Sequence, residues 1–131
     1  MRREIPPEQY KGRYREPVTE NDLLIMGSRP ETTVGSITLE DGIYKSLWRL
    51  SLETGFGMMI DIRKIPLPQE FIDVCERQDI DPYDAPFDGT IYVAHPVSSY
   101  HLKKGISVIG YLTKEKVCRI INRDRESYLG S

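Results

Sequence analysis

The residues best suited to chemistry lie in two short segments. The first holds the two histidines of the chain, His95 and His101, with Ser98 and Ser99 between them. A serine beside a histidine could supply a nucleophile and its general base, but such a pair needs an orienting acid and a sharp strand-to-helix turn. The segment has neither a GxSxG pattern nor an acid in that context. We therefore predict that both histidines lie in a loop or at a strand end.

The second segment is an acidic loop, in which four aspartates fall within ten residues. Oxygen ligands at this spacing could bind calcium or magnesium. The loop lacks the glycine and the terminal glutamate of an EF-hand, however. We predict solvated turn carboxylates and no metal site, with Asp79 or Asp81 capping a short turn before Pro82. The four residues are Asp79, Asp81, Asp84 and Asp88.

Neither the glycines nor the cysteines indicate a further catalytic site. The sequence Gly55-Phe56-Gly57 is similar to a phosphate loop only superficially, because a phosphate site needs a following helix N-terminus and this segment precedes a predicted strand. Cys75 and Cys118 are far apart, and each lies among apolar residues. We predict two reduced thiols in the core and no disulfide.

Composition limits the class of protein. The chain has 131 residues, a formal net charge of −2 and 39% hydrophobic residues. These values are typical of one soluble globular domain, and nothing in the charge balance indicates nucleic-acid binding. The apolar runs are far shorter than the roughly 20 residues that span a bilayer. We expect a cytoplasmic protein with no contact to nucleic acid or membrane.

The first half of the chain is predicted to contain an arm, a strand and a helix. Residues 1–21 combine prolines, cations and tyrosines with offsetting glutamates, which predicts an extended arm. The ordered domain, residues 22–131, then begins with a strand at Asp22–Gly27, followed by a polar turn. Helical spacing of apolar residues predicts a helix from Thr38 to Thr54. Thr38 and Asp41 resemble a capping box, and Gly55 is suited to the left-handed helix end.

The second half is predicted to complete a sheet. Gly57 to Ile62 has the pattern of a strand, and prolines introduce a helix from Gln69 to about Gln78, with Phe71, Val74 and Cys75 facing inward. Two later strands flank Thr113–Lys116 and are predicted to pair as a hairpin that finishes the sheet. The last three predicted strands are Thr90–Ala94, Ile106–Leu112 and Lys116–Ile121.

The order of these motifs resembles the C-terminal domain of the aminoimidazole ribonucleotide (AIR) synthase superfamily, also called PurM-like. The likeness spans roughly Asp22 to Ile121 and is nearest to the hydrogenase maturation factor branch, HypE. It implies an α+β fold in which helices pack on a mixed sheet. The segments that carry it are LETGFGMMID, KIPLPQEFIDVCERQDIDPYDAPFDG, TIYVA and VIGYLTKEKV.

The resemblance also implies what this sequence lacks. In the family, a separate N-terminal domain carries the aspartates that hold magnesium and nucleotide, and no segment here matches it. Phosphoryl transfer needs metal-held phosphates and positioned cations. We therefore expect no catalysis by this chain alone, no catalytic residue, and ATP with magnesium only if a partner domain binds them. The chain ends in SYLGS, so the cysteine tail of the hydrogenase factor and its carbamoyl chemistry do not carry over.

Four residues take family positions near the ligand. Asp41 and Gly42 stand where family members carry a glycine pair before the first helix, and Asp88 and Gly89 stand at a turn that faces the nucleotide and substrate cleft. The resemblance implies that these four contact a ligand. The family's insertion before the first helix is shortened here, and the helix after the TIYVA strand is compressed.

Two functional hypotheses follow. The first is a non-catalytic interaction module that forms a homo-oligomer or docks on a separate nucleotide-binding-domain protein. The second is the substrate-side half of a split ATP-dependent enzyme of the AIR synthase or hydrogenase-maturation type. A domain that normally packs on a companion would leave apolar surface to be covered, which favours the first hypothesis.

Overall fold

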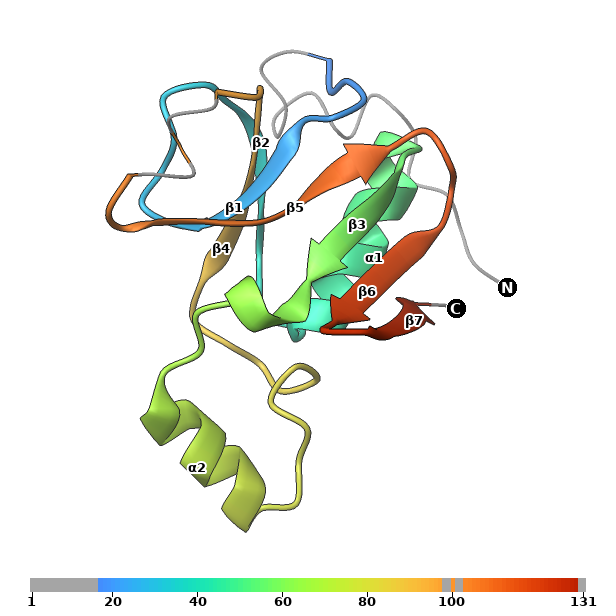
Figure 1. Cartoon of the computed structure of the whole chain (residues 1–131). Coiled ribbons are helices and arrows are strands. Elements are labelled where there is room, and N and C mark those ends of the chain that lie inside the picture. The colour runs from blue at the N-terminus through green and yellow to red at the C-terminus, as the bar shows by residue number, and fades with distance from the viewer. Residues whose placement is uncertain (1–16, 98–99, 101–102, 130–131) are drawn as a thin grey trace.

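In the computed structural model, which describes residues 17–97, 100 and 103–129, seven strands form one mixed sheet with α1 packed on one face (Figure 1). The strand order is β2-β4-β1-β5-β3-β6-β7, and all neighbours are antiparallel except β3 and β6. This confirms the predicted α+β class and the mixed sheet. The elements are β1 (Leu23–Gly27), β2 (Thr33–Thr38), α1 (Ile43–Thr54), β3 (Gly57–Asp61), η2 (Ile62–Lys64), α2 (Gln69–Arg77), β4 (Thr90–Ala94), β5 (Ile106–Thr113), β6 (Cys118–Asn122) and β7 (Arg125–Leu129).

The main core lies between α1 and the sheet. Ile43, Leu47 and Leu50 form the apolar stripe of the helix and are fully buried against alternate strand residues such as Met58 and Ile60. Burying each of these side chains contributes roughly 1.5–3 kcal/mol. Since successive strand residues point to opposite faces, the intervening residues lie on the side of the sheet away from α1.

Helix α1 starts later than the sequence predicts. Thr38 is the last residue of β2, and the helix begins after Gly42, which makes no side-chain cap hydrogen bond. The predicted capping box of Thr38 and Asp41 is therefore wrong. The predicted end is right: Gly55 adopts the left-handed conformation at φ 77°, and its N–H donates to the Ser51 carbonyl.

Two strands were missed and one pairing was wrong. β2 lies in the segment predicted as a polar turn, and β7 follows the strand predicted to be last. β5 and β6 do not form a hairpin, because β3 lies between them and pairs with both. The connection from β5 to β6 passes so close to Gly57 that a Cβ there would overlap the carbonyl oxygen of Glu115. The glycine thus permits the crossover that separates the two strands.

Helix α2 extends beyond the end of the sheet (Figure 1). The one aromatic ring of α2, Phe71, meets Phe87 edge-on with 5.0 Å between ring centroids. Cys75 is buried as predicted, whereas Val74 is 40% exposed, so the prediction that it faces inward is wrong. Both cysteines are buried and free, as the sequence predicts.

The described residues give no helix with the length and apolar character to span a membrane. Residues 1–16 of the predicted arm lie outside the described part of the chain. The arm's last residues form a turn in which the Thr19 backbone N–H and hydroxyl both donate to the Asp22 carboxylate.

Candidate functional site

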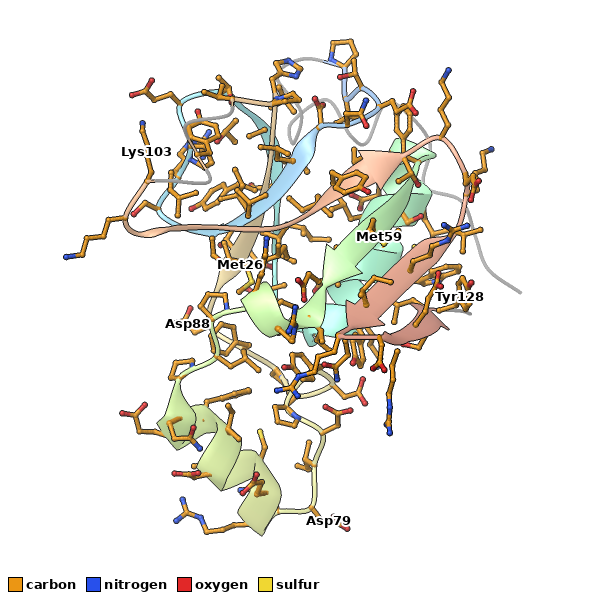
Figure 2. All side chains as sticks on the ribbon, in the orientation of Figure 1. Met26, Met59, Asp79, Asp88, Lys103 and Tyr128 are labelled. Carbon is orange, nitrogen blue, oxygen red and sulfur yellow. The ribbon has the colours of Figure 1, made fainter. Side chains whose placement is uncertain are left out.

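Asp88 and Gly89, two of the predicted ligand residues, line a pocket of about 350 Å³. Asp88 is exposed, and its position between the sheet and α2 is labelled in Figure 2. The pocket has mostly apolar and aromatic walls, so a small molecule with one cationic or hydroxyl group facing Asp88 would suit it. The other lining residues are Met26, Gly27, Pro66, Phe87, Thr90 and Tyr92.

Asp41 and Gly42, the other two, lie nearby but do not line this pocket. Backbone hydrogen bonds join Leu39 to Phe87 and Gly89, which brings the two predicted segments side by side. Gly42 has φ 94° and ψ 158°, and a Cβ there would lie 2.6 Å from the Asp84 carbonyl oxygen. Asp41 pairs with Arg49 at 3.0 Å. In this structure both residues have local structural roles at the start of α1.

A second surface was not found from the sequence. Tyr111, Met59, Arg119 and Tyr128 stand opposite one another on β5, β3, β6 and β7, which are consecutive in the sheet. Their chain neighbours Leu112, Met58 and Cys118 belong to the α1 core, so this row points away from α1. We call the row the open sheet face. Tyr111 is 41% exposed and Tyr128 is 59% exposed.

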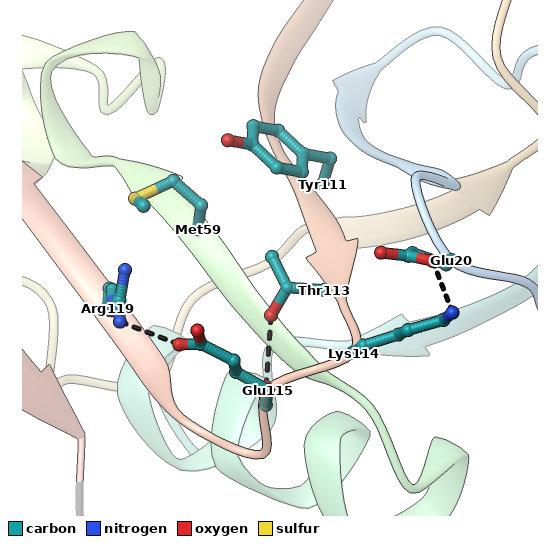
Figure 3. Close-up of a pocket in the computed structure, with 7 residues that line it drawn as sticks. All are labelled: Glu20, Met59, Tyr111, Thr113, Lys114, Glu115 and Arg119. Atoms are coloured by element: carbon teal, nitrogen blue, oxygen red, sulfur yellow. Dashed lines mark hydrogen bonds and ion pairs between the residues drawn. The ribbon is translucent and has the colours of Figure 1, made fainter.

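A pocket of about 330 Å³ opens on this face (Figure 3). Met59 and Tyr111 form its apolar part, and charged side chains surround them. Arg119 Nη2 lies 2.7 Å from Glu115 Oε2, and Lys114 Nζ lies 3.6 Å from Glu20 Oε2. An apolar centre inside a rim of both charge signs is the pattern of a protein interface. The sequence could not show the row, because it depends on which residues the strands place in register.

The other half of the same face is covered. Over β1 and β4, Tyr100 packs with Leu23, Ile25 and Ala94 in a small separate core. The Tyr100 hydroxyl lies within hydrogen-bond distance of the Thr32 backbone nitrogen and hydroxyl, at 3.1 and 3.2 Å.

His95 directly follows β4, which confirms the predicted strand-end position. It nevertheless has an acid beside it, contrary to the sequence prediction: His95 Nδ1 lies 2.9 Å from Oδ1 of the fully buried Asp22. The two residues are 73 positions apart, so no local pattern could have indicated the pair. His101, Ser98 and Ser99 lie outside the described residues. The described geometry therefore gives an imidazole that is oriented by a buried carboxylate.

Aspartates of the acidic loop stabilise a turn and place negative charge near Tyr44. Asp81 accepts a hydrogen bond from the Tyr83 N–H at 2.9 Å, so the predicted cap at this position is confirmed. Burial, with the charges of Asp81 and Asp84 nearby, raises the pKa of Tyr44 to about 12. Among the described residues, no three His, Cys, Asp or Glu side chains are grouped so as to hold a metal ion.

Comparison with known proteins identifies the fold. No protein-family profile and no curated protein matches the sequence. Among solved structures, the chain is similar to that of the HypE–HypF complex, with TM-score 0.70 and 13% identity over 87% of this chain and 54% of that one. It is also similar to hydrogenase maturation protein HypE in complex with ATP, with TM-score 0.69 and 8% identity over 87% of this chain and 51% of that one. A third structure, ThiL complexed with AMPPCP and TMP, gives TM-score 0.60 and 11% identity over 88% and 52%.

These likenesses confirm the PurM-like, HypE-like fold predicted from the sequence. At such low identity they show the fold alone. The chain spans about half the length of each of these structures.

Proposed function

We propose that this domain is a non-catalytic interaction module that self-associates through the open sheet face. The observation that carries the proposal is the row of Tyr111, Met59, Arg119 and Tyr128 across four neighbouring strands. Tyrosine, methionine and arginine are side chains enriched at protein interfaces, where they bury large areas.

The charges at the rim of the open sheet face are suited to binding a second copy of the domain. Lys114 and Arg119 lie beside Glu20 and Glu115, so one surface carries both signs. In a two-fold interface the same patch meets itself, and a patch with both signs can then pair each cation with a carboxylate of the other copy. The HypE–HypF complex supports the broader idea that a protein with this fold engages a protein partner.

The test is the mass of the purified chain by light scattering over a range of concentrations, with and without magnesium-ATP. We expect a dimer or larger oligomer, no effect of nucleotide, and dissociation of the Tyr111→Glu variant. Ile80→Glu is the matched control, because Ile80 is also 41% exposed but lies away from the row. A monomer at every concentration, or equal effects of the two variants, would contradict the proposal.

A second candidate function is the substrate-side half of a nucleotide-dependent enzyme. Two observations favour it: the pocket lined by Asp88 and Gly89, and the nucleotides ATP and AMPPCP named in two structures of which this chain spans about half. Here a companion domain would bind the nucleotide and this chain would contribute Asp88. A rise in melting temperature with magnesium-ATP, lost in Asp88→Ala, would favour the enzyme over the interaction module.

A further inference from the structure

We infer that β7 pairs with β7 of a second copy of this chain, so that two sheets join edge to edge across a two-fold axis. This contact is separate from the proposed self-association, because it uses the edge of the sheet instead of its open face. β7 is an edge strand, and among the described residues no strand pairs with its outer side (Figure 1). An edge strand presents unpaired N–H and C=O groups, which form a template for a further strand.

The two edges of the sheet differ in how open they are. At the β2 edge most residues are buried, and the pairing with β4 is irregular between Thr33 and Gly35. Burial and irregular pairing both protect an edge from the addition of a strand. At the β7 edge the register with β6 is regular along the whole strand, and every residue of β7 except Leu129 is exposed. A new strand can therefore be added at β7 without rearrangement.

The hairpin between β6 and β7 determines which backbone groups face outward. A two-residue turn joins the strands, so Asn122 and Arg125 close it as a hydrogen-bonded pair. Hydrogen-bonded and non-hydrogen-bonded pairs alternate along an antiparallel ladder. Counting from Arg125, the main-chain N–H and C=O groups of Glu126 and Tyr128 are the ones directed away from β6. A further strand would bond these two residues.

One antiparallel register of β7 against itself uses both residues. It places Ser127 opposite Ser127 of the second copy and Glu126 opposite Tyr128 of the second copy, so each outward N–H meets an outward C=O. A slip by one residue would set outward groups against inward ones. A slip by two toward the turn would place Glu126 opposite its own copy, and like charges directly opposite destabilise a sheet. The favoured register repeats each contact twice, as a two-fold interface requires.

The side chains support the same register. Tyr128 is 59% exposed, and its hydroxyl donates to Glu126 Oε1 of the same strand at 3.2 Å. In the pair, Tyr128 of each copy stands opposite Glu126 of the other, and the two Tyr128 rings become diagonal neighbours within reach of each other. Arg125 faces Leu129 of the second copy and meets no cation there. The charges of β7 thus oppose many pairings of this edge but not the pairing with itself.

The test is a disulfide across the two-fold axis. Ser127 and its copy form a non-hydrogen-bonded pair with Cα atoms about 4.5 Å apart, and disulfides accept Cα separations of about 4.4–6.8 Å. The full-length Ser127→Cys variant is oxidised with glutathione disulfide, and we expect a covalent dimer on non-reducing electrophoresis that dithiothreitol reverses. Cys75 and Cys118 are buried, and the unchanged chain under the same treatment measures their background.

The matched control is Arg125→Cys, which places an exposed thiol on the same strand and the same face as Ser127. In the inferred register the two introduced thiols lie four residues apart along the strands, roughly 14 Å, which is too far for a disulfide. We expect the Ser127→Cys dimer to form at least about tenfold faster. Equal rates, or no dimer from Ser127→Cys, would overturn the inference. Pairing of β7 with another protein or with the chain's own residues 1–16 would give no Ser127→Cys dimer.

A second pair of variants tests the backbone. Glu126→Pro removes an outward N–H that proline on an edge strand can lack without disturbing the fold. Glu126→Ala removes the same side chain and keeps that N–H. Light scattering over a range of concentrations gives the dimer dissociation constant, and we expect it to be at least about tenfold higher for the proline variant than for the alanine variant. Equal dissociation constants would contradict pairing through this edge.

The same measurements separate this inference from the proposed function. Tyr111 lies on β5, which β3 and β6 separate from β7, so Tyr111→Glu should reduce a larger oligomer to the edge-joined dimer and leave the Ser127→Cys crosslink intact. A mass that falls in Tyr111→Glu, with no Ser127→Cys crosslink, would support the open sheet face and overturn the edge contact. A crosslink with a mass unchanged by Tyr111→Glu would support the edge contact and overturn the proposed function.

Discussion

The sheet face opposite α1 has a covered half and an open half. Over β1 and β4, Tyr100 is 2% exposed and buries Leu23 and Ile25 beneath it. Over β5, β3, β6 and β7, Tyr111 and Tyr128 are 41% and 59% exposed. The strands alternate in the same way in both halves, so the difference comes from what lies on top of them. A tyrosine is a core residue in one half and an exposed residue in the other.

The largest effect is expected from Tyr100→Ala. The change removes a buried ring and the hydroxyl that contacts Thr32, and loss of a large core aromatic costs about 3–5 kcal/mol. Urea denaturation of this variant and of Tyr111→Ala compares the two halves directly, and we expect Tyr111→Ala to cost less than about 1 kcal/mol. Similar losses in the two variants would break the distinction between the covered and the open half.

A smaller effect is expected at the polar edge of the covered half. Asp22→Ala removes the carboxylate that accepts hydrogen bonds from the Thr19 N–H and hydroxyl and that lies beside His95. Leaving buried polar partners unsatisfied costs about 1–3 kcal/mol. A double-mutant cycle with His95→Ala, measured by urea denaturation, isolates the Asp22–His95 term. Strict additivity of the two changes would show that the Asp22–His95 contact itself contributes nothing to stability.

The sequence predicted the elements whose signals are local. The glycine stop at Gly55 and the prolines before Gln69 set a helix end and a helix start without help from distant residues. β2 was missed because Gly35 and Ser36 interrupt its β-branched residues, and the strand forms by pairing with β4 through an irregular register between Thr33 and Gly35. The insertion of β3 between β5 and β6 is likewise a non-local pairing that no turn motif encodes.

The residues of the candidate site could likewise be predicted only where the signal lies in one local motif. The resemblance placed Asp88 at a family turn that faces a ligand cleft, and in the structure Asp88 lines a pocket. Its contact with a ligand stays a prediction. Gly42 was placed by the same resemblance, but here its positive φ and its close approach to the Asp84 backbone account for the glycine without a ligand. The Asp22–His95 pair and the row on the open sheet face depend on register between distant strands, which a single sequence does not contain.

We expect a substitution in the open half to change the self-association of the domain while changing its folding stability little. Met59→Glu should disrupt self-association, because a carboxylate would lie between Tyr111 and Arg119 in the centre of the row. The expected loss of folding free energy is about 1 kcal/mol or less, since Met59 is only partly buried. Light scattering and thermal melting of the same sample separate the two effects. A large drop in melting temperature together with an unchanged mass would show that the row serves the fold.

The smallest effect is expected at the rim of this face. Glu115→Gln removes one charge from the pair with Arg119, whose Nε also lies 3.5 Å from Glu126 Oε1. Exposed ion pairs contribute about 0–1 kcal/mol, so the isolated domain should melt almost unchanged. If the rim orients a second copy, the same substitution should weaken association, and more so at low salt, because screening already reduces rim charges at high salt. Measuring the dimer dissociation constant at two salt concentrations checks this. An effect that is independent of salt would assign Glu115 a packing role instead of an electrostatic one.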